Sequence, residues 1–198
     1  MWVKVCGLSR PEDVTAAVEA GADAVGFVLA ESPRQVSPEV ARALGEGLTV
    51  ERVLVTVDAL PDQLMRWAEE AGATGVQPHG RHSAAAGDAA IAEGLIVLHP
   101  VPIQSEFDLD DVAADRVPLL DTYESARHGG TGSAFDWTLI EGVQRDFVLA
   151  GGLRPGNVAR AIAEVSPWGV DASSGLESAP GEKDPELIRR FVREAKQT

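Results

Sequence analysis

The chain has 198 residues, and its 31 acidic and 17 basic side chains give a formal net charge of −14. Such a surface repels phosphate backbones and anionic lipid, so we expect neither nucleic acid nor a membrane as a partner. The single cysteine can form neither an internal disulfide nor a structural zinc cluster, which indicates a reducing compartment, the cytoplasm.

Eight runs rich in Val, Ile, Leu and Ala predict β-strands along the chain. They span residues 3–8, 23–29, 52–58, 75–79, 95–101, 117–122, 146–151 and 168–173. Segments with the apolar spacing of helices alternate with these strands. A capping box of Ser9 and Glu12 precedes the first of these helices, and Asp184 is the expected N-cap of the last. The predicted helices lie around Val14 to Val18, at 38–47, around Leu64 to Ala71, at 83–93, at 105–114, at 135–143, around Val158 to Val165, and from Pro185 onward.

A strand followed by a helix, repeated eight times, requires parallel strands, because neighbouring parallel strands need a crossover of this size. Right-handed crossovers allow an open doubly wound sheet or a closed barrel. Eight units favour the barrel, so we expect an α/β protein with one (β/α)8 TIM barrel domain over residues 1–198. In such a barrel the active site lies where the strands end, which directs attention to the residues that close each run.

Cys6 closes the first run, "VKVC". Strand alternation places Lys4 and Cys6 on one face and two valines on the other, and the apolar pair suits the helix layer. A lone cysteine is often only a small core residue. At the end of a barrel strand and beside an ammonium group, however, its thiol is a candidate general base or nucleophile.

Asp121 closes the sixth run, "VPLLD". A carboxyl group that follows buried leucines is expected to have a raised pKa, which suits a general acid. The alternative is an aspartate that caps a helix or a turn. Together, Cys6 and Asp121 predict a base and an acid on different strands around one pocket.

Two glycine-rich stretches follow the last two strands. "LAGGLRPGNV" contains Gly151 and Gly152, and "VDASSG" contains Ser173 and Ser174. Either could be an ordinary turn. In these barrels, however, the loops after strands seven and eight often bind phosphate through bare backbone N–H groups. In an acidic protein an anionic ligand has to be held locally in this way.

Three further features are candidates for the rim of the pocket. Arg34 in "SPRQVSP" could grip a carboxylate with its planar fork, although a loop arginine is often only solvated. His79 ends the fourth run and has either a pocket or a structural role. The stretch "HGGTGSAFDW", residues 128–137, is a glycine loop that could cover a ligand or act as a plain hinge.

Taken together, these motifs resemble the phosphoribosylanthranilate isomerases of tryptophan biosynthesis over nearly the whole chain. The resemblance rests on "KVCGL", "GADAVGFVLAESPRQV", "VQPHG", "LLDT", "GGTGSAFDW", "LAGGLRPGNV" and "GVDASSGLESAPGEKD", in that order. It implies a (β/α)8 barrel that rearranges N-(5-phosphoribosyl)anthranilate, a small phosphosugar, without metal or coenzyme.

The resemblance also implies a role for each candidate residue. Cys6 matches the family's base, Asp121 its acid and Arg34 the partner of the anthranilate carboxylate. The phosphate-binding positions are Gly151, Gly152, Ser173 and Ser174. Asp171 is implied as a contact of a sugar hydroxyl. His79 is predicted as a substrate contact from its place at the end of the fourth run.

Three other readings remain open at this stage. A dual-substrate isomerase that also serves histidine biosynthesis would resemble this chain, but such barrels carry an aspartate where Cys6 stands. A flavin-dependent oxidoreductase would use the same phosphate loops, and so would a silent phosphosugar-binding barrel. The sequence leaves open whether the chain is a monomer or a homodimer.

Overall fold

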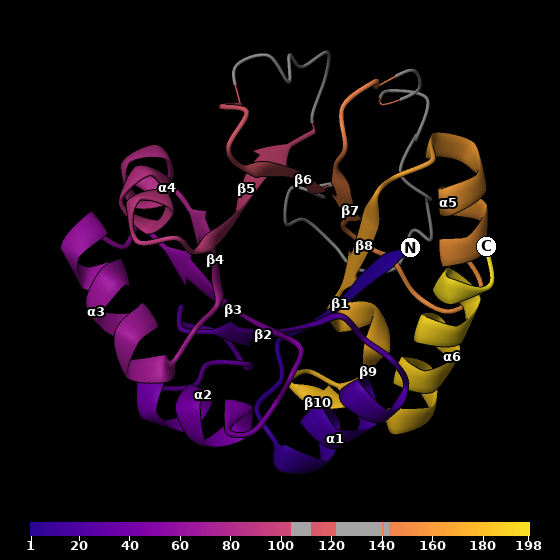
Figure 1. Ribbon diagram of the computed structural model, residues 1–198. Coiled ribbons are helices and arrows are strands. Elements are labelled where there is room, and N and C mark those ends of the chain that lie inside the picture. Colours follow the sequence, from indigo (N-terminus) through magenta and orange to yellow (C-terminus); the bar gives the residue numbers. More distant parts are fainter. Residues whose placement is uncertain (104–111, 122–139, 141–142) are drawn as a thin grey trace.

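The computed structural model describes residues 1–103, 112–121, 140 and 143–198. Eight parallel strands form one closed barrel in the order β1 to β8, which confirms the predicted fold class (Figure 1). The strands are β1 (Trp2–Cys6), β2 (Ala24–Val28), β3 (Glu51–Val57), β4 (Gly75–His79), β5 (Ile96–Pro102), β6 (Val117–Asp121), β7 (Val148–Ala150) and β8 (Gly169–Ala172). The barrel closes where β1 pairs with β8, with Lys4 opposite Asp171.

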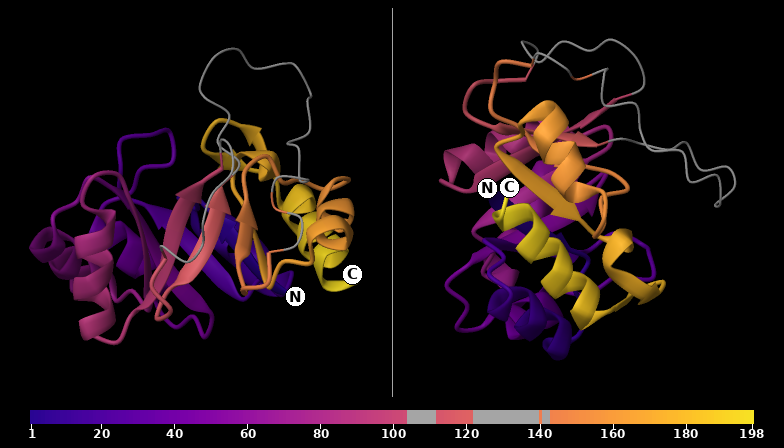
Figure 2. Two further views of the ribbon diagram at one scale, coloured as in Figure 1. Left: turned by 90° about the horizontal axis from the view of Figure 1, so that it is seen from above. Right: turned by 90° about the vertical axis from the view of Figure 1, so that its right-hand side faces the viewer.

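Six α-helices of the described residues cover the outside of the barrel. They are α1 (Pro11–Glu19), α2 (Pro38–Gly45), α3 (Pro61–Ala71), α4 (Ser83–Ala92), α5 (Val158–Val165) and α6 (Pro185–Lys196). Most of them begin with a proline, whose fixed φ suits the first helical turn. Helix α6 lies next to α5 on the outside of the barrel, and both ends of the chain are on this side (Figure 2).

Helix α6 begins as the sequence predicts, but α1 does not. Asp184 caps α6 by accepting hydrogen bonds from the backbone N–H groups of Glu186 and Leu187. The capping box predicted at the start of α1 is wrong, because the helix begins at Pro11 with Arg10 as an N-cap that makes no side-chain cap bond. Ser9 instead donates to the carbonyl of Gly181 at 3.4 Å.

The two helices predicted at 105–114 and 135–143 fall almost entirely outside the described residues. Of the first, residues 112–114 are described and are not helical. Of the second, only residues 140 and 143 are described.

A small antiparallel hairpin extends beyond the barrel. A short 3-10 helix, η3 (Ser174–Leu176), follows β8 and leads into β9 (Glu177–Ala179) and β10 (Glu182–Lys183). Asp184 then starts α6. The hairpin therefore lies at the end of the barrel where β8 ends, which is the end expected to carry the active site.

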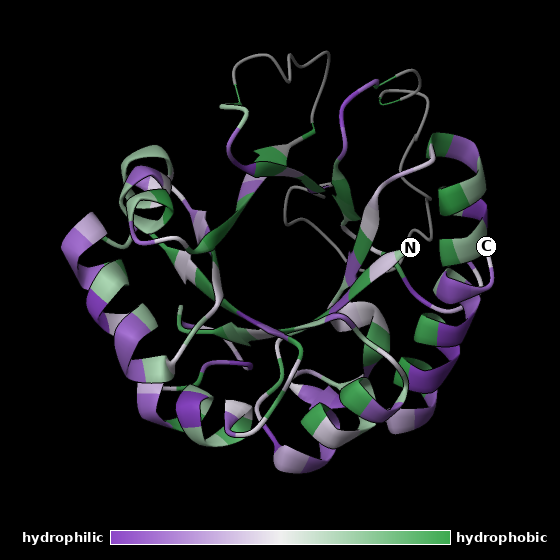
Figure 3. Ribbon diagram, in the orientation of Figure 1, coloured by the Kyte–Doolittle hydropathy of each residue, from purple (hydrophilic) through white to green (hydrophobic). Residues whose placement is uncertain are grey.

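Apolar side chains form two separate layers. The larger one lies between the strands and the helices, and Val3 and Val5 belong to it, as strand alternation predicts. A smaller cluster fills the barrel interior with Ala24, Val53, Leu98, Leu119, Val148 and Ala150. In Figure 3 each helix carries both hydrophobic and hydrophilic residues, while the strands are coloured more by hydrophobic residues. This is the pattern expected for amphipathic helices packed on a barrel.

Candidate active site

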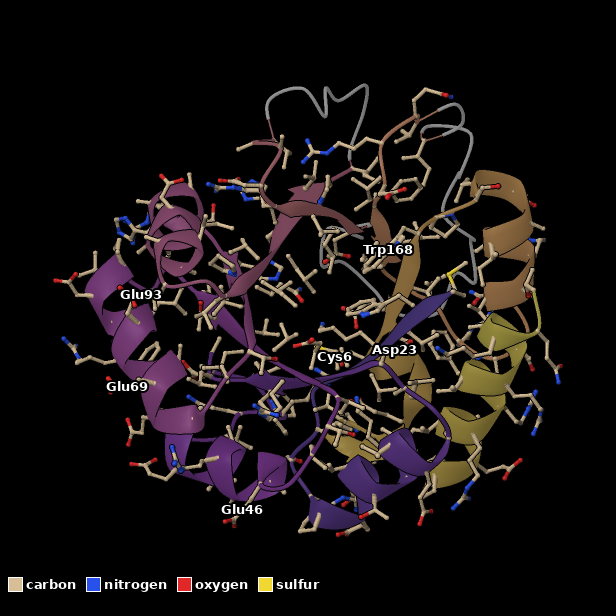
Figure 4. All side chains as sticks on the ribbon, viewed as in Figure 1. Cys6, Asp23, Glu46, Glu69, Glu93 and Trp168 are labelled. Atoms are coloured by element: carbon tan, nitrogen blue, oxygen red, sulfur yellow. The ribbon has the colours of Figure 1, made fainter. Side chains whose placement is uncertain are left out.

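A cavity of about 230 Å³ lies at the carboxyl ends of β1, β4, β6, β7 and β8. Among the described residues, every candidate site residue that the sequence nominates except Arg34 lines it. These are Cys6, His79, Asp121, Gly151, Gly152, Asp171, Ser173 and Ser174. Larger hollows lie among the outer helices and the loops that follow them, but Cys6 sits inside the ring of strands (Figure 4).

Cys6 is nearly buried and faces the barrel interior. Gly26 of β2 lies opposite it, and a Cβ at Gly26 would stand only 2.8 Å from the Cys6 sulfur, so this glycine leaves room for the thiol. Burial raises the pKa of the Cys6 thiol, because desolvation penalises the thiolate. The ammonium groups of Lys4 and Lys183 oppose that rise in pKa.

Lys4 is the central member of a buried polar network. Its side chain is fully buried, and its Nζ donates to Asp171 Oδ2 and to Gln77 Oε1, both at 2.8 Å. Gln77 Nε2 lies 3.0 Å from His79 Nε2, and since an amide nitrogen can only donate, the imidazole accepts there. Burial and the Lys4 charge lower the pKa of His79 to about 4, which fits a neutral ring. The other oxygen of Asp171, Oδ1, is buried without a hydrogen-bond partner among the described residues.

Gln77 was missed in the sequence analysis, although a signal was present. It precedes His79 by two positions in β4, so strand alternation places both side chains on the inner face. Sequence reasoning considered only the residue that closes the strand.

Asp121 closes β6 and is partly exposed to the cavity. Burial raises the pKa of its carboxyl group, the charge of Asp171 adds to that rise, and Lys4 opposes it. The pKa of Asp121 is therefore shifted upward, as expected for a general acid. The residues that follow Asp121 in the chain, including the glycine loop predicted at 128–137, lie outside the described residues.

The loops after β7 and β8 meet at the cavity. Gly151 and Gly152 have φ values of 84° and 63°, a conformation that glycine adopts without strain. Asn157 fixes this turn, since its side-chain nitrogen donates to the Gly152 carbonyl at 3.0 Å and its oxygen accepts from the Arg154 N–H at 2.8 Å. A Cβ at Gly175 would collide with the Leu153 carbonyl, so only glycine allows the two loops to approach this closely.

Arg34 stands at the rim, in the loop after β2, and is held by an acidic side chain. Its Nε and Nη2 donate to the two carboxylate oxygens of Glu177 at 2.6 and 2.7 Å. A Cβ at Gly7 would lie within 2.9 Å of both the Arg34 side chain and the Ser173 hydroxyl, so these two residues come together beside Gly7. Lys183 also binds Glu177, at 2.7 Å. Sequence analysis did not single out Glu177 or Lys183.

Within the described residues, no group of three or more His, Cys, Asp or Glu side chains is arranged to hold a metal ion. The same part of the chain contains no helix with the length and hydropathy of a membrane span.

Comparisons with known proteins identify one family. The family model described as N-(5'phosphoribosyl)anthranilate (PRA) isomerase matches residues 3–194. The N-(5'-phosphoribosyl)anthranilate isomerase of Citrifermentans bemidjiense is 44% identical over 204 residues, which cover 98% of this chain and 96% of that protein. The enzyme of the same name from Thermotoga petrophila is 40% identical, with 98% of each chain covered.

Solved structures agree with the sequence comparisons. The crystal structure of phosphoribosyl anthranilate isomerase from Thermotoga maritima has a TM-score of 0.90 and 39% identity, with complete coverage of both chains. Another crystal structure, of an isomerase in complex with reduced 1-(o-carboxyphenylamino)-1-deoxyribulose 5-phosphate, has a TM-score of 0.85 and 37% identity over the same coverage. This chain belongs to the family of N-(5'-phosphoribosyl)anthranilate isomerases.

Proposed function

We propose that this chain converts N-(5-phosphoribosyl)anthranilate to 1-(2-carboxyphenylamino)-1-deoxyribulose 5-phosphate, with Asp121 as general acid and Cys6 as general base. The observation that carries this proposal is a single cavity lined by a thiol, a carboxyl group and two glycine- and serine-rich loops. The solved relative that binds a reduced form of this product supports it.

The reaction is an internal oxidation and reduction that needs only proton transfers. Asp121 gives a proton to the ring oxygen of the ribose, the bond from that oxygen to C1 breaks, and the anthranilate nitrogen supplies electrons to form a Schiff base. Cys6 then removes the proton from C2, which gives an enolamine. The enolamine takes up a proton at C1 and loses one from the C2 hydroxyl, which leaves the ketone.

The environments of the two groups suit opposite tasks. Burial favours the protonated carboxyl of Asp121, which is the form that donates. For Cys6, the nearby ammonium groups of Lys4 and Lys183 stabilise the thiolate against the cost of burial. A low-dielectric cavity also strengthens the attraction between these ammonium groups and the thiolate that acts as base.

The other candidates hold the substrate in this proposal. The backbone N–H groups of the loops with Gly151, Gly152, Ser173 and Ser174 bind the phosphate. Asp171 Oδ1, which has no partner among the described residues, accepts a hydrogen bond from a sugar hydroxyl.

The remaining contacts are at the walls and the rim. Neutral His79 lines the wall as a substrate contact. Arg34 binds the anthranilate carboxylate at the rim. No metal or coenzyme takes part.

The wider setting follows from the sequence. We propose one domain over residues 1–198 that works in the cytoplasm as a monomer or a homodimer. The net charge of −14 argues against nucleic acid or a membrane as its partner, and a small phosphosugar is held locally by the loops after β7 and β8.

The test is direct turnover. Phosphoribosylanthranilate is added to the purified protein, and the loss of its fluorescence is followed. Wild type is expected to turn it over, while Cys6→Ser and Asp121→Asn lower kcat by about 100-fold or more. Lys196→Met, which breaks a surface ion pair with Asp23 at 2.6 Å, serves as a control that keeps its activity. Absence of turnover by wild type at high enzyme concentration would contradict the proposal.

A further inference from the structure

Glu177 is a nearly buried carboxylate that binds two cations at once. Its side chain is only 5% exposed. It accepts two hydrogen bonds from Arg34 and one from Lys183, whose side chain is fully buried. Burying the charges of Glu177 and Lys183 is costly unless they are paired with good geometry, so this cluster is an organised feature of the rim.

The hairpin that carries these residues joins two loops of the site. Glu177 and Lys183 lie opposite each other in β9 and β10. Lys183 Nζ also donates to the Ser173 carbonyl at 3.0 Å and to the Ser173 hydroxyl at 3.4 Å. The hairpin thus holds the loop after β2 through Arg34 and the loop after β8 through Ser173.

The backbone strengthens the first of these links. Gly181, at the turn of the hairpin, packs so closely on the Pro33 carbonyl that a Cβ there would collide with it. The Gly181 N–H donates to Glu177 Oε2 at 3.3 Å. The residue next to Arg34 and the carboxylate that binds Arg34 are therefore fixed by the same turn.

The bond geometry leaves one edge of the guanidinium for a ligand. An arginine has two edges that can bind a carboxylate with paired N–H groups: Nε with one terminal nitrogen, and the two terminal nitrogens together. Glu177 takes the first edge, because its partners are Nε and Nη2. The second edge remains suited to a substrate carboxylate.

The net charge of this cluster also favours an anionic ligand beside Arg34. Arg34 and Lys183 together carry one more unit of charge than Glu177 neutralises. A further anion at this rim is therefore attracted, even though the chain as a whole carries −14.

We propose that Glu177 and Lys183 are positioning residues for substrate binding. Glu177 turns Arg34 so that its outer edge meets the carboxylate of the substrate, and Lys183 ties Glu177 to the phosphate loop at Ser173. The hairpin thereby sets the separation between the two anionic ends of the ligand. This inference rests on the isomerase function and on the role of Arg34 proposed above.

The test compares two substrates in steady-state kinetics. One is phosphoribosylanthranilate, and the other is N-(5-phosphoribosyl)aniline, which lacks the carboxylate. Glu177→Gln is expected to raise KM for the first by on the order of 10-fold, with kcat within about threefold, and to change KM for the second by less than about twofold. Glu177→Asp restores part of the loss. In an Arg34→Met background, Glu177→Gln is expected to have no further effect.

Lys183 is tested through the phosphate end of the site. Lys183→Met is expected to weaken competitive inhibition by inorganic phosphate several-fold, whereas Lys183→Arg weakens it less. Lys196→Met, at the end of α6 that is remote from the hairpin and paired with Asp23, is the control and leaves the inhibition unchanged.

Folding is controlled separately. Glu177→Gln could fail to fold, because two cations lose their partner. In that case the double variant Glu177→Gln/Lys183→Met, which removes one of those cations, is compared with Lys183→Met alone. Thermal unfolding identifies the variants that are folded.

Three outcomes would contradict the positioning role. A folded Glu177→Gln variant with unchanged or lowered KM for phosphoribosylanthranilate overturns the positioning role, because Glu177 would then be neutral or a competitor for Arg34. An equal rise in KM for both substrates overturns it as well. A wild type that turns over neither substrate defeats the isomerase function itself, and the positioning role falls with it.

Discussion

The Nζ of Lys4 lies 2.8 Å from Asp171 Oδ2, and this ion pair spans the seam where β1 and β8 close the barrel. Both side chains are buried, and Gln77 accepts the next hydrogen bond of the ammonium group. The pKa of Lys4 is raised, because attraction by Asp171 and Cys6 outweighs the opposing effect of burial. One charged pair therefore serves both the closure of the barrel and the electrostatics of the thiol.

Removing Lys4 should destabilise the protein and impair the thiol together. Lys4→Met leaves Asp171 buried without its cation, for which the expected loss in free energy of unfolding is about 3 to 5 kcal/mol. Urea unfolding at neutral pH measures it. Lys4→Met/Asp171→Asn should lose less than the sum of the two single variants, since neither charge is then left alone. Strict additivity would show that the pair is not coupled.

The pH dependence of kcat/KM should have two limbs displaced to higher pH. The pKa of Asp121 and the pKa of Cys6 are both raised, mainly by burial. The reactive form needs a protonated Asp121 and a deprotonated Cys6. Because the thiol has the higher pKa, this form is a minor fraction whose amount stays constant between the two pKa values. The rate should therefore rise with pH up to the pKa of Asp121, remain level, and fall above the pKa of Cys6.

Two measurements assign these limbs. The rate of alkylation of Cys6 by iodoacetamide against pH gives the thiol pKa directly, and it should match the alkaline limb. Asp121→Asn should abolish the alkaline limb, so that the residual activity rises with pH up to the pKa of Cys6 and then stays level. An alkaline limb below the ordinary pKa of a free thiol would contradict the effect of burial on Cys6.

The strands and most of the cavity could be predicted because their signals are local. Alternation in "VKVC" places Cys6 inward, and a residue that closes a barrel strand must lie at the catalytic end. Glu177 and Lys183 could not be found in this way. The contact of Glu177 with Arg34 joins positions 143 residues apart, and nothing in either segment's periodicity encodes it.

The error at the start of α1 has a local physical cause. Ser9 and Glu12 match a capping pattern, but Pro11 already fixes the first helical turn one residue later than that pattern requires. Ser9 is then released to bond Gly181 of the hairpin. The proline signal therefore outweighed the capping pattern.

Acid should destabilise the protein through His79. Its pKa falls from 6.5 to about 4 because burial and the Lys4 charge disfavour the imidazolium. A lowered pKa means that this contribution to stability is complete above pH 6.5 and is lost as the pH falls toward 4. The expected loss across that window is roughly 3 kcal/mol.

The measurement is the free energy of unfolding at several pH values for wild type and His79→Gln. Glutamine keeps an oxygen that can accept the hydrogen bond from Gln77 but cannot titrate. The variant should therefore show a shallower loss of stability between pH 6.5 and 4 than wild type. His82→Gln, at a residue that does not line the cavity, is the control and should retain the wild-type slope. Parallel curves for His79→Gln and wild type would show that His79 is not the group responsible.

Gly175→Ala should damage substrate binding by moving one phosphate loop against the other. The added Cβ would collide with the Leu153 carbonyl, which is backbone and cannot swing aside as a flexible side chain could. The loops after β7 and β8 must then separate, so the N–H groups of Gly152 and Ser173 no longer converge on one phosphate. We expect KM to rise by on the order of 10-fold and inhibition by inorganic phosphate to weaken in parallel.

Gly169→Ala is the matched control, since its Cβ would crowd Trp2 at 2.8 Å at the opposite end of β8. It should reduce stability without changing KM, and if the two variants instead raised KM equally, general destabilisation rather than the meeting of the loops would account for the effect.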